Sequence, residues 1–254
     1  YDGQDVLLDV FLDGGEAQLT VNDHTWQGLD WNRSMMRLKA PAHKGDRFNI
    51  EIEAFVINYP YDGWRNDERN NHVFKRARLV CRDKDLEDFY LDAQWAMDVY
   101  IHYWESDQNL ELERMILTNL QIACAGIDIY ETDRATLRKQ VKTARGLLHK
   151  LVYEHPGFRH DGTLSLCAQS HLDIIYLWPI KETFRKNCRT STNALSLMRE
   201  FPEFKFSQSQ PFLYKALKRM YPKVYDEIKQ RVKEGRWEVI GGMFVEPDGN
   251  LRVE

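Results

Sequence analysis

The first third of the chain alternates apolar and polar positions with a period of two. The clearest stretch is RFNIEIEAF, residues 47–55, in which every second residue is apolar. Three further segments, DVLLDVFL, AQLTVN and MMRLKAP, are dense in β-branched or alternating residues and are separated by the turn sequences DGG, ND and HKGD. Strands with one apolar and one polar face pack against each other. Residues 1–82 are therefore predicted to form a β-sandwich domain.

The turn sequences then give way to a helical apolar period. Between residues 83 and 160, apolar residues recur at helical spacing, as in Leu137, Val141 and Leu148, which lie four and then seven positions apart. Thr132 or Asp133 would cap the start of the last helix, because both side chains can accept a hydrogen bond from a free backbone N–H. This segment is predicted to be a helical linker region.

From residue 162 onward, short apolar strands alternate with long amphipathic segments. The strands are TLSLCAQ, EFKFSQS and RWEVIGG, and the helices are expected near residues 180–201 and 211–235. Pro211 suits the first position of the second helix, and Gly235 suits its C-terminal cap. This order predicts parallel strands joined by crossover helices.

Polar residues lie at the end of each of the three strands. His171 and Asp173 come after the first strand, Gln208 and Gln210 lie at the end of the second, and Glu246 and Asp248 come after the third. The carboxyl ends of parallel strands are where such folds collect their ligand chemistry. In an extended segment, residues two apart face the same way, so His171 and Asp173 could present two ligands to one ion. The residues alone leave other interpretations open: a loop histidine that helps to cap a helix, and a plain turn at EPDGN.

Composition narrows the classes of function. The 254 residues are 43% hydrophobic and 29% charged, with a formal net charge of −4 and interspersed signs. The sequence contains no basic stripe of the kind that binds nucleic acid or an anionic membrane. It also contains no window of about 18 apolar residues, which a helix needs to span a bilayer. The four cysteines are far apart, which favours a reducing, cytoplasmic location.

The order of the short motifs is more informative than any one of them. H-x-D at residues 171–173 is followed by LWP, ET, RK, RT, PEF, SQ, GG and finally VEPDGN. Over residues 163–251 this series resembles glycoside hydrolase family 38, the retaining α-mannosidases. The segments GGEAQLTVN and WQGLDWN resemble patterns that precede the catalytic domain in that family.

The resemblance implies a fold and a site. Residues 161–254 would be the first, incomplete part of a (β/α)7 barrel, so that the chain ends inside the catalytic domain of a multidomain enzyme. His171, Asp173 and Asp248 would bind one divalent metal ion, for which zinc is the expected identity, and Asp248 would also be the nucleophile. Tyr176 stands where the family usually has a tryptophan that stacks on the sugar. The acid/base residue is expected beyond residue 254, so the chain alone is expected to be inactive.

The expected substrate is a glycan with terminal α-mannosyl residues, and the sequence leaves homo-oligomerisation open. One alternative is a metal-dependent enzyme similar to polysaccharide deacetylases, which also place Asp and His ligands on strand ends. Another is a carbohydrate-binding piece without catalysis. For the latter, the candidate stacking residues, which could equally pack a core, are Trp26, Trp31, Tyr59, Tyr61 and Trp64.

Overall fold

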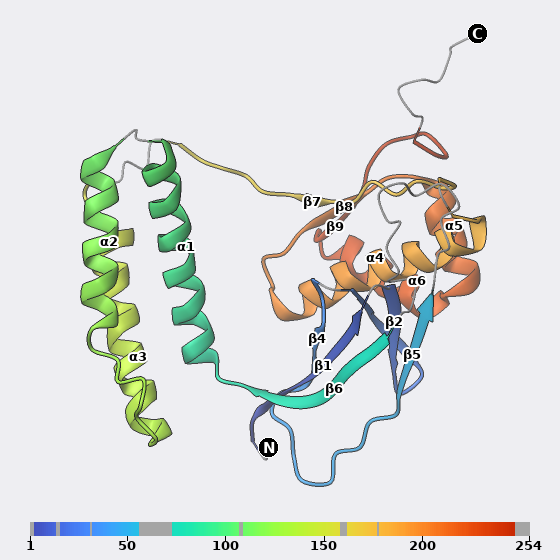
Figure 1. Cartoon of the computed structure of the whole chain (residues 1–254). Coiled ribbons are helices and arrows are strands. Elements are labelled where there is room, and N and C mark those ends of the chain that lie inside the picture. The colour runs from blue at the N-terminus through green and yellow to red at the C-terminus, as the bar shows by residue number, and fades with distance from the viewer. Residues whose placement is uncertain are drawn as a thin grey trace. The chain divides into compact units, whose positions relative to one another are not determined.

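The structure, a computed structural model, describes residues 3–13, 16–30, 32–55, 73–106, 109–157, 162–176 and 178–246. The chain divides into two compact units. One combines residues 1–80 with residues 165–254, and the other comprises residues 81–164 (Figure 1). The predicted residues that lie outside the described ones are Trp31, Tyr59, Tyr61, Trp64 and Asp248.

Two three-stranded sheets form the N-terminal part of the first unit. The first sheet has the order β4-β1-β6, with β1 at Asp5–Asp13, β4 at Met35–Lys39 and β6 at Val73–Arg82. The second has the order β3-β2-β5, with β2 at Glu16–Val21, β3 at His24–Leu29 and β5 at Ile50–Phe55. The four predicted strands are present as β1, β2, β4 and β5, whereas β3 and β6 were not anticipated. The segment of β3 lacks a run of alternating residues.

The second sheet begins with a tight hairpin. Asn22 and Asp23 join β2 to β3, with φ values of 50° and 60°. Two successive residues with positive φ fit the type I′ hairpin turn, which Asn and Asp tolerate better than most residues. Apolar side chains of both sheets then gather in one buried cluster: Leu8, Val10, Leu12, Ala17, Leu19, Val21, Leu29 and Met36.

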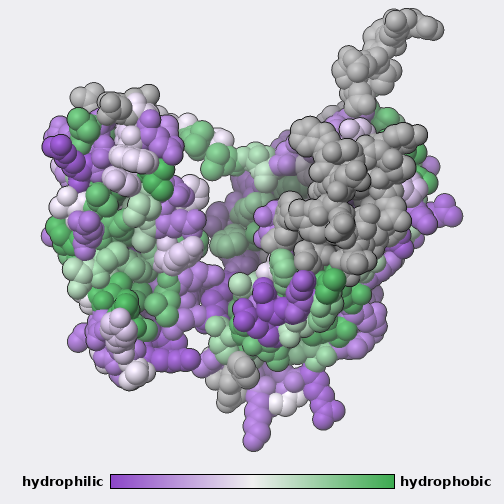
Figure 2. All heavy atoms as spheres, in the orientation of Figure 1, coloured by the Kyte–Doolittle hydropathy of each residue, from purple (hydrophilic) through white to green (hydrophobic). Residues whose placement is uncertain are grey.

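The second unit is helical, as the sequence predicted. It contains α1 (Lys84–Ser106), α2 (Leu110–Cys124), α3 (Arg134–Leu148) and a π-helical turn, η1 (His149–Tyr153). Asp133 is the N-cap of α3 and accepts a hydrogen bond from Thr136 N. Of the two predicted caps, Asp133 is therefore the one used. On the face of this unit visible in Figure 2, hydrophobic and hydrophilic surface are interspersed.

A short parallel sheet carries the C-terminal part of the first unit. Its strands are β7 (Ala168–Gln169), β8 (Phe206–Gln208) and β9 (Trp237–Val239), in that order. α4 (Ile180–Glu200) connects β7 to β8, and α5 (Pro211–Met220) with α6 (Pro222–Lys233) connects β8 to β9. Both pairings are parallel, which confirms the predicted crossover order.

The expectation of one long helix over residues 211–235 was wrong. The chain leaves the helix at Tyr221, whose φ is −134°, and a new helix starts at Pro222. Proline lacks the N–H that would continue the backbone ladder, and it disfavours helical geometry in the residue before it. The apolar period of the sequence continues across the break, so periodicity did not reveal it.

One face of the parallel sheet is covered by α4, α5 and α6. The rings of Phe206 and Trp237 lie 4.8 Å apart, and their cluster includes Leu195, Leu217 and Ile228 from the three helices. This cluster fixes the strands, and with them the loops that leave the carboxyl ends of the strands.

Helix α4 also binds the N-terminal sheets through polar side chains. Lys186 Nζ donates to Glu16 Oε1 over 2.8 Å, and Arg199 donates to the carbonyl of Trp26 over 3.0 Å. The first and last parts of the chain therefore share one folded unit. No helix within the described residues combines the length and the apolar content needed to cross a bilayer.

Candidate functional site

The loop after β7 holds the predicted pair of ligands. His171 and Asp173 follow the strand within four residues, and His171 Nε2 lies 3.2 Å from Asp173 Oδ1. Both side chains remain accessible, with 53% and 37% of their surface exposed. The structure thus brings the two residues together in an open position, while the buried Leu172 between them points into the protein.

Glu246, beyond the end of β9, contacts the opposite nitrogen of the same imidazole. Its Oε2 lies 2.5 Å from His171 Nδ1, and its Oε1 accepts a hydrogen bond from Ser209 Oγ. Ser209 directly follows β8. The carboxyl ends of all three parallel strands therefore converge on one histidine.

The charges at this cluster favour ionised groups. The hydrogen bonds that the ring of His171 donates to Glu246 and to Asp173 raise the pKa of His171, outweighing the smaller effect of burial. The hydrogen bond from Ser209 lowers the pKa of Glu246, and the hydrogen bond to His171 acts in the same direction. An ionised carboxylate can only accept, so the Nδ1 atom of His171 carries the proton of this contact.

Helix α4 and the segment after β8 anchor the loop that carries His171. Gln210, which is 1% exposed, donates from its side-chain amide to the carbonyl of Leu172 over 2.9 Å. Thr183 in the first turn of α4 donates to the carbonyl of Ile174 and accepts from Trp178 Nε1. The loop therefore has main-chain anchors on both sides of Asp173.

Tyr176 occupies an exposed place on this loop. Its side chain is 66% accessible, and its ring meets Trp178 edge-on at 5.9 Å between centroids. A T-shaped contact covers at most one face of the Tyr176 ring, so the other face stays open, as stacking on a sugar would require. Its neighbour Trp178 is less available, because Lys186 Nζ lies 4.8 Å from the centre of its ring.

Two other predicted residues have different outcomes. Gln208 is 4% exposed, and its side-chain amide makes no hydrogen bond within the described structure. It is buried rather than presented to a ligand. Asp248, the predicted nucleophile and third ligand, lies outside the described residues. Among the described residues no three histidine, cysteine, aspartate or glutamate side chains form a metal-binding group.

The donors that the structure does describe fit a zinc-like ion. Imidazole and carboxylate are both good ligands of zinc. With bonds of roughly 2.0–2.2 Å and tetrahedral angles, two donors on one zinc ion lie about 3.4 Å apart. The separation of 3.2 Å between His171 Nε2 and Asp173 Oδ1 is close to that value.

A cavity of about 500 Å³ adjoins this cluster, within the size range of small-molecule sites. His171 is one of the residues that line it, together with Lys186, Arg189 and Asn193 of α4. Both cations are already paired with Glu16, so the cavity offers hydrogen-bonding groups rather than unpaired charge.

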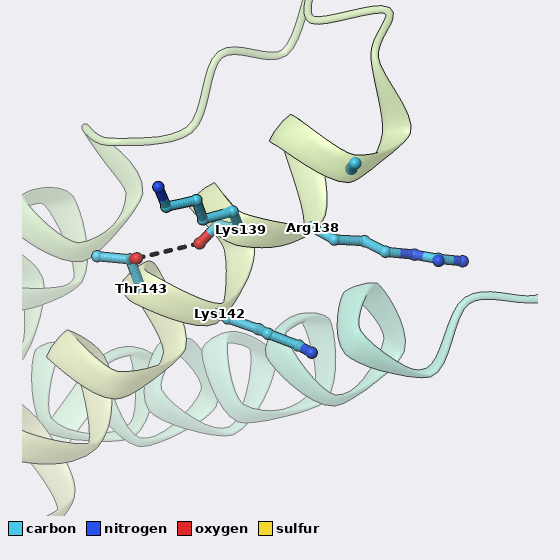
Figure 3. A pocket seen from close by; sticks show the side chains of 5 residues that line it. Arg138, Lys139, Lys142 and Thr143 are labelled. Atoms are coloured by element: carbon cyan, nitrogen blue, oxygen red, sulfur yellow. Dashed lines mark hydrogen bonds between the residues drawn. The ribbon is translucent and has the colours of Figure 1, made fainter.

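A hollow on α3 is a poorer candidate. It is lined by three cations, of which Arg138 and Lys142 extend to one side of the helix and Lys139 to the other (Figure 3). Arg138 lies 2.8 Å from Asp83, and Lys142 lies 3.3 Å from Asp85. Two of the three cations are therefore paired, and the three do not converge, so this hollow does not form an anion site.

The sequence did not indicate that Glu246 contacts His171, or that Ser209 contacts Glu246. The only signal was their position after the ends of β8 and β9, where Ser209 is the next residue after β8 and Glu246 lies seven residues past Val239.

Comparison with known proteins gives the cluster its context. Residues 161–253 match the family model described as the glycosyl hydrolases family 38 N-terminal domain. The chain is 25% identical to alpha-mannosidase G of Dictyostelium discoideum over 232 residues, which are 89% of this chain and 20% of that protein. It is 37% identical over 108 residues, 42% of this chain and 10% of the relative, to alpha-mannosidase 2C1 of Homo sapiens.

The mouse alpha-mannosidase 2C1 is 33% identical over 185 residues, which is 73% of this chain and 17% of that protein. The chain therefore spans a fifth or less of the length of the curated relatives described here. The matched family segment contains β7, β8, β9 and every residue of the cluster around His171. Residues 161–253 are thus a segment of the glycoside hydrolase family 38 N-terminal-domain type, and the relatives compared with them are named alpha-mannosidases.

Proposed function

We propose that these 254 residues act within a longer protein as part of a metal-dependent, retaining α-mannosidase. The observation that carries the proposal is the pair His171 and Asp173 at the end of a parallel strand, with two donor atoms 3.2 Å apart. The pair lies in the segment that matches family 38, whose relatives compared above are named alpha-mannosidases. This match favours a mannosidase over a deacetylase-like enzyme.

In the proposed site, His171 Nε2, the carboxylate of Asp173 and that of Asp248 hold one divalent metal ion, with zinc the best fit to the donors. The bound ion supplies a positive charge that orients sugar hydroxyls. His171 and Asp173 keep their positions because α4 and Gln210 anchor their loop. Tyr176 offers an open ring face to the sugar.

Asp248 is the proposed nucleophile. Its carboxylate would attack the anomeric carbon and form a covalent glycosyl-enzyme, while a second carboxyl group protonates the leaving oxygen. Water would then cleave this ester with the second group acting as base, which retains the configuration. We place that second group outside these 254 residues.

The finer architecture belongs to the same proposal. The two N-terminal sheets would form a β-sandwich, and the parallel sheet would be the start of a (β/α)7 barrel. We also propose a cytoplasmic location and a glycan substrate with terminal α-mannosyl residues. The cysteines support a reducing compartment, because Cys81, Cys124, Cys167 and Cys188 are all unpaired.

Covalent trapping tests this function. The full-length protein that carries these residues would be treated with a 5-fluoro mannosyl fluoride, digested and mapped by mass spectrometry. We expect one labelled peptide, with the label on Asp248. A matched Asp248→Asn variant should remain unlabelled.

A label on another residue, Glu246 included, would contradict the assignment of the nucleophile. Inversion of configuration at the anomeric carbon, followed by NMR, would contradict the retaining mechanism. Release of acetate from an acetylated glycan without hydrolysis of an aryl α-mannoside would favour the deacetylase-like enzyme instead.

A further inference from the structure

His171 has two ring nitrogens, and the structure gives each a different carboxylate. Nε2 faces Asp173 Oδ1 at 3.2 Å, and Nδ1 faces Glu246 Oε2 at 2.5 Å. A histidine that ligates a metal uses one nitrogen for the ion, and the hydrogen bond made by the other nitrogen decides which tautomer forms. The two carboxylates around His171 are therefore suited to different tasks.

We propose that Glu246 is a positioning residue, which holds the proton of His171 on Nδ1 and so keeps Nε2 free, next to Asp173, for a metal ion. The proposal rests on the function proposed above. Glu246 contacts the nitrogen remote from Asp173, so it would act on the ligand and not on the ion.

Ser209 completes the arrangement. Its hydroxyl donates to Glu246 Oε1 while Oε2 faces the imidazole, so the two oxygens of one carboxylate have separate partners. Glu246 is more protected than the residue it orients, with 28% of its side chain exposed against 53% for His171. The orientation of the His171 ring is therefore set by one residue from each strand end: Asp173 and Glu246 contact the ring, and Ser209 holds Glu246.

The first test reads the tautomer without any metal. Long-range ¹H–¹⁵N NMR spectra of the metal-free chain, at a pH at which the ring of His171 is neutral, report which nitrogen carries the proton. We expect Nδ1–H in the parent chain and a shift toward Nε2–H in Glu246→Ala. Nε2–H as the main form in the parent would overturn the proposal.

The second test measures metal affinity. Zn²⁺ would be titrated against a chelating dye with the parent chain, Glu246→Gln, Ser209→Ala and the control Glu238→Gln, which changes an exposed residue of β9. Loss of a partner that orients a ligand typically lowers metal affinity by about 10–100-fold. We expect a loss in that range for Glu246→Gln, a smaller loss for Ser209→Ala and none for the control.

The outcomes distinguish a failure of the positioning role of Glu246 from a failure of the proposed metal site. Unchanged affinity in Glu246→Gln, when the parent binds zinc, would overturn the positioning role and leave the metal site intact. A loss as large as that of His171→Ala would show that Glu246 is itself a ligand, which also overturns the role. If the parent binds no zinc, the proposed metal site fails, and the tautomer experiment still decides whether Glu246 orients His171.

Discussion

Gly28 of β3 and Asn193 of α4 meet where the N-terminal sheets pack against the first helix of the parallel sheet. The backbone N–H of Gly28 donates to Asn193 Oδ1 over 2.9 Å. A Cβ atom on Gly28 would lie only 2.8 Å from Arg189 Cβ. The helix can pack at this distance because residue 28 has no side chain, so the sequence WQGLD encodes an interface.

The first prediction concerns this approach. Gly28→Ala should destabilise the protein by roughly 1–3 kcal/mol, because the new methyl group meets a Cβ atom that cannot rotate away. Denaturant unfolding followed by tryptophan fluorescence would measure the change. Gly146→Ala in α3, where nothing lies within 4 Å, should instead be neutral or stabilising. Equal effects of the two substitutions would contradict this packing.

The second prediction concerns a buried charge pair next to the same interface. Arg189 donates to Glu182 Oε1 over 2.5 Å, and their side chains are 6% and 0% exposed. Arg189→Ala would leave Glu182 buried without its main partner, at a cost of about 3–5 kcal/mol in the free energy of unfolding. The exposed pair of Lys229 and Asp226 provides the control, since Lys229→Ala should change stability by less than about 0.5 kcal/mol.

A double variant sharpens this prediction. Replacing both charges, as in Glu182→Gln with Arg189→Met, should recover most of the stability lost in Arg189→Ala, because neither partner is then left as an unpaired buried charge. If the double variant is as unstable as the single one, the cost comes from packing and not from charge.

The third prediction is a pH dependence. Asp9 of β1 is fully buried between Arg76 and Arg78 of β6. Burial opposes its ionisation, but hydrogen bonds and charges from the two arginines outweigh burial and lower its pKa. A carboxyl group whose pKa is lowered by folding stabilises the protein above its unfolded pKa of about 3.9, and this stabilisation is lost as the pH falls toward the folded value.

Unfolding of the parent chain should therefore become easier as the pH falls below about 4. Asp9→Asn should lower stability at neutral pH and flatten this dependence. Guanidinium unfolding at several pH values would measure both effects, with the exposed Asp226→Asn as the control. An Asp9→Asn variant whose pH profile matches that of the parent would rule out this role.

The fourth prediction concerns metal removal. If His171 and Asp173 ligate the ion, zinc at 100 times its dissociation constant should stabilise the parent chain by about 2.7 kcal/mol, and a chelator should abolish this gain. His171→Ala and Asp173→Ala should each remove the zinc response, whereas the exposed His102→Ala should keep it. A zinc response that persists in both ligand variants would show that zinc binds at residues other than His171 and Asp173.

The sequence by itself determined the classes of element and several of their details. The period of two predicted β1, β2, β4 and β5, and the period of 3.6 predicted the helices, because burial of one face constrains every residue on that face. The sequence also predicted three residues at helix ends, because each acts through its own local backbone geometry: Asp133 as a cap, Pro211 at a helix start and Gly235 after a helix end.

Local pattern failed where a distant part of the chain supplies the stabilisation. β3 has little alternation, and it is held by pairing with β2 and by packing on α4. The break at Pro222 was hidden by an apolar period that continues across it.

The candidate site shows the same division. The sequence placed His171 and Asp173 on one side of an extended segment, because that depends only on a spacing of two. Only the tertiary structure decided that Glu246, 75 residues away, faces the other nitrogen of the same imidazole, and that Ser209 holds Glu246 there. The physical reason is the parallel sheet, which brings the ends of β7, β8 and β9 to one edge whatever the length of the helices between them.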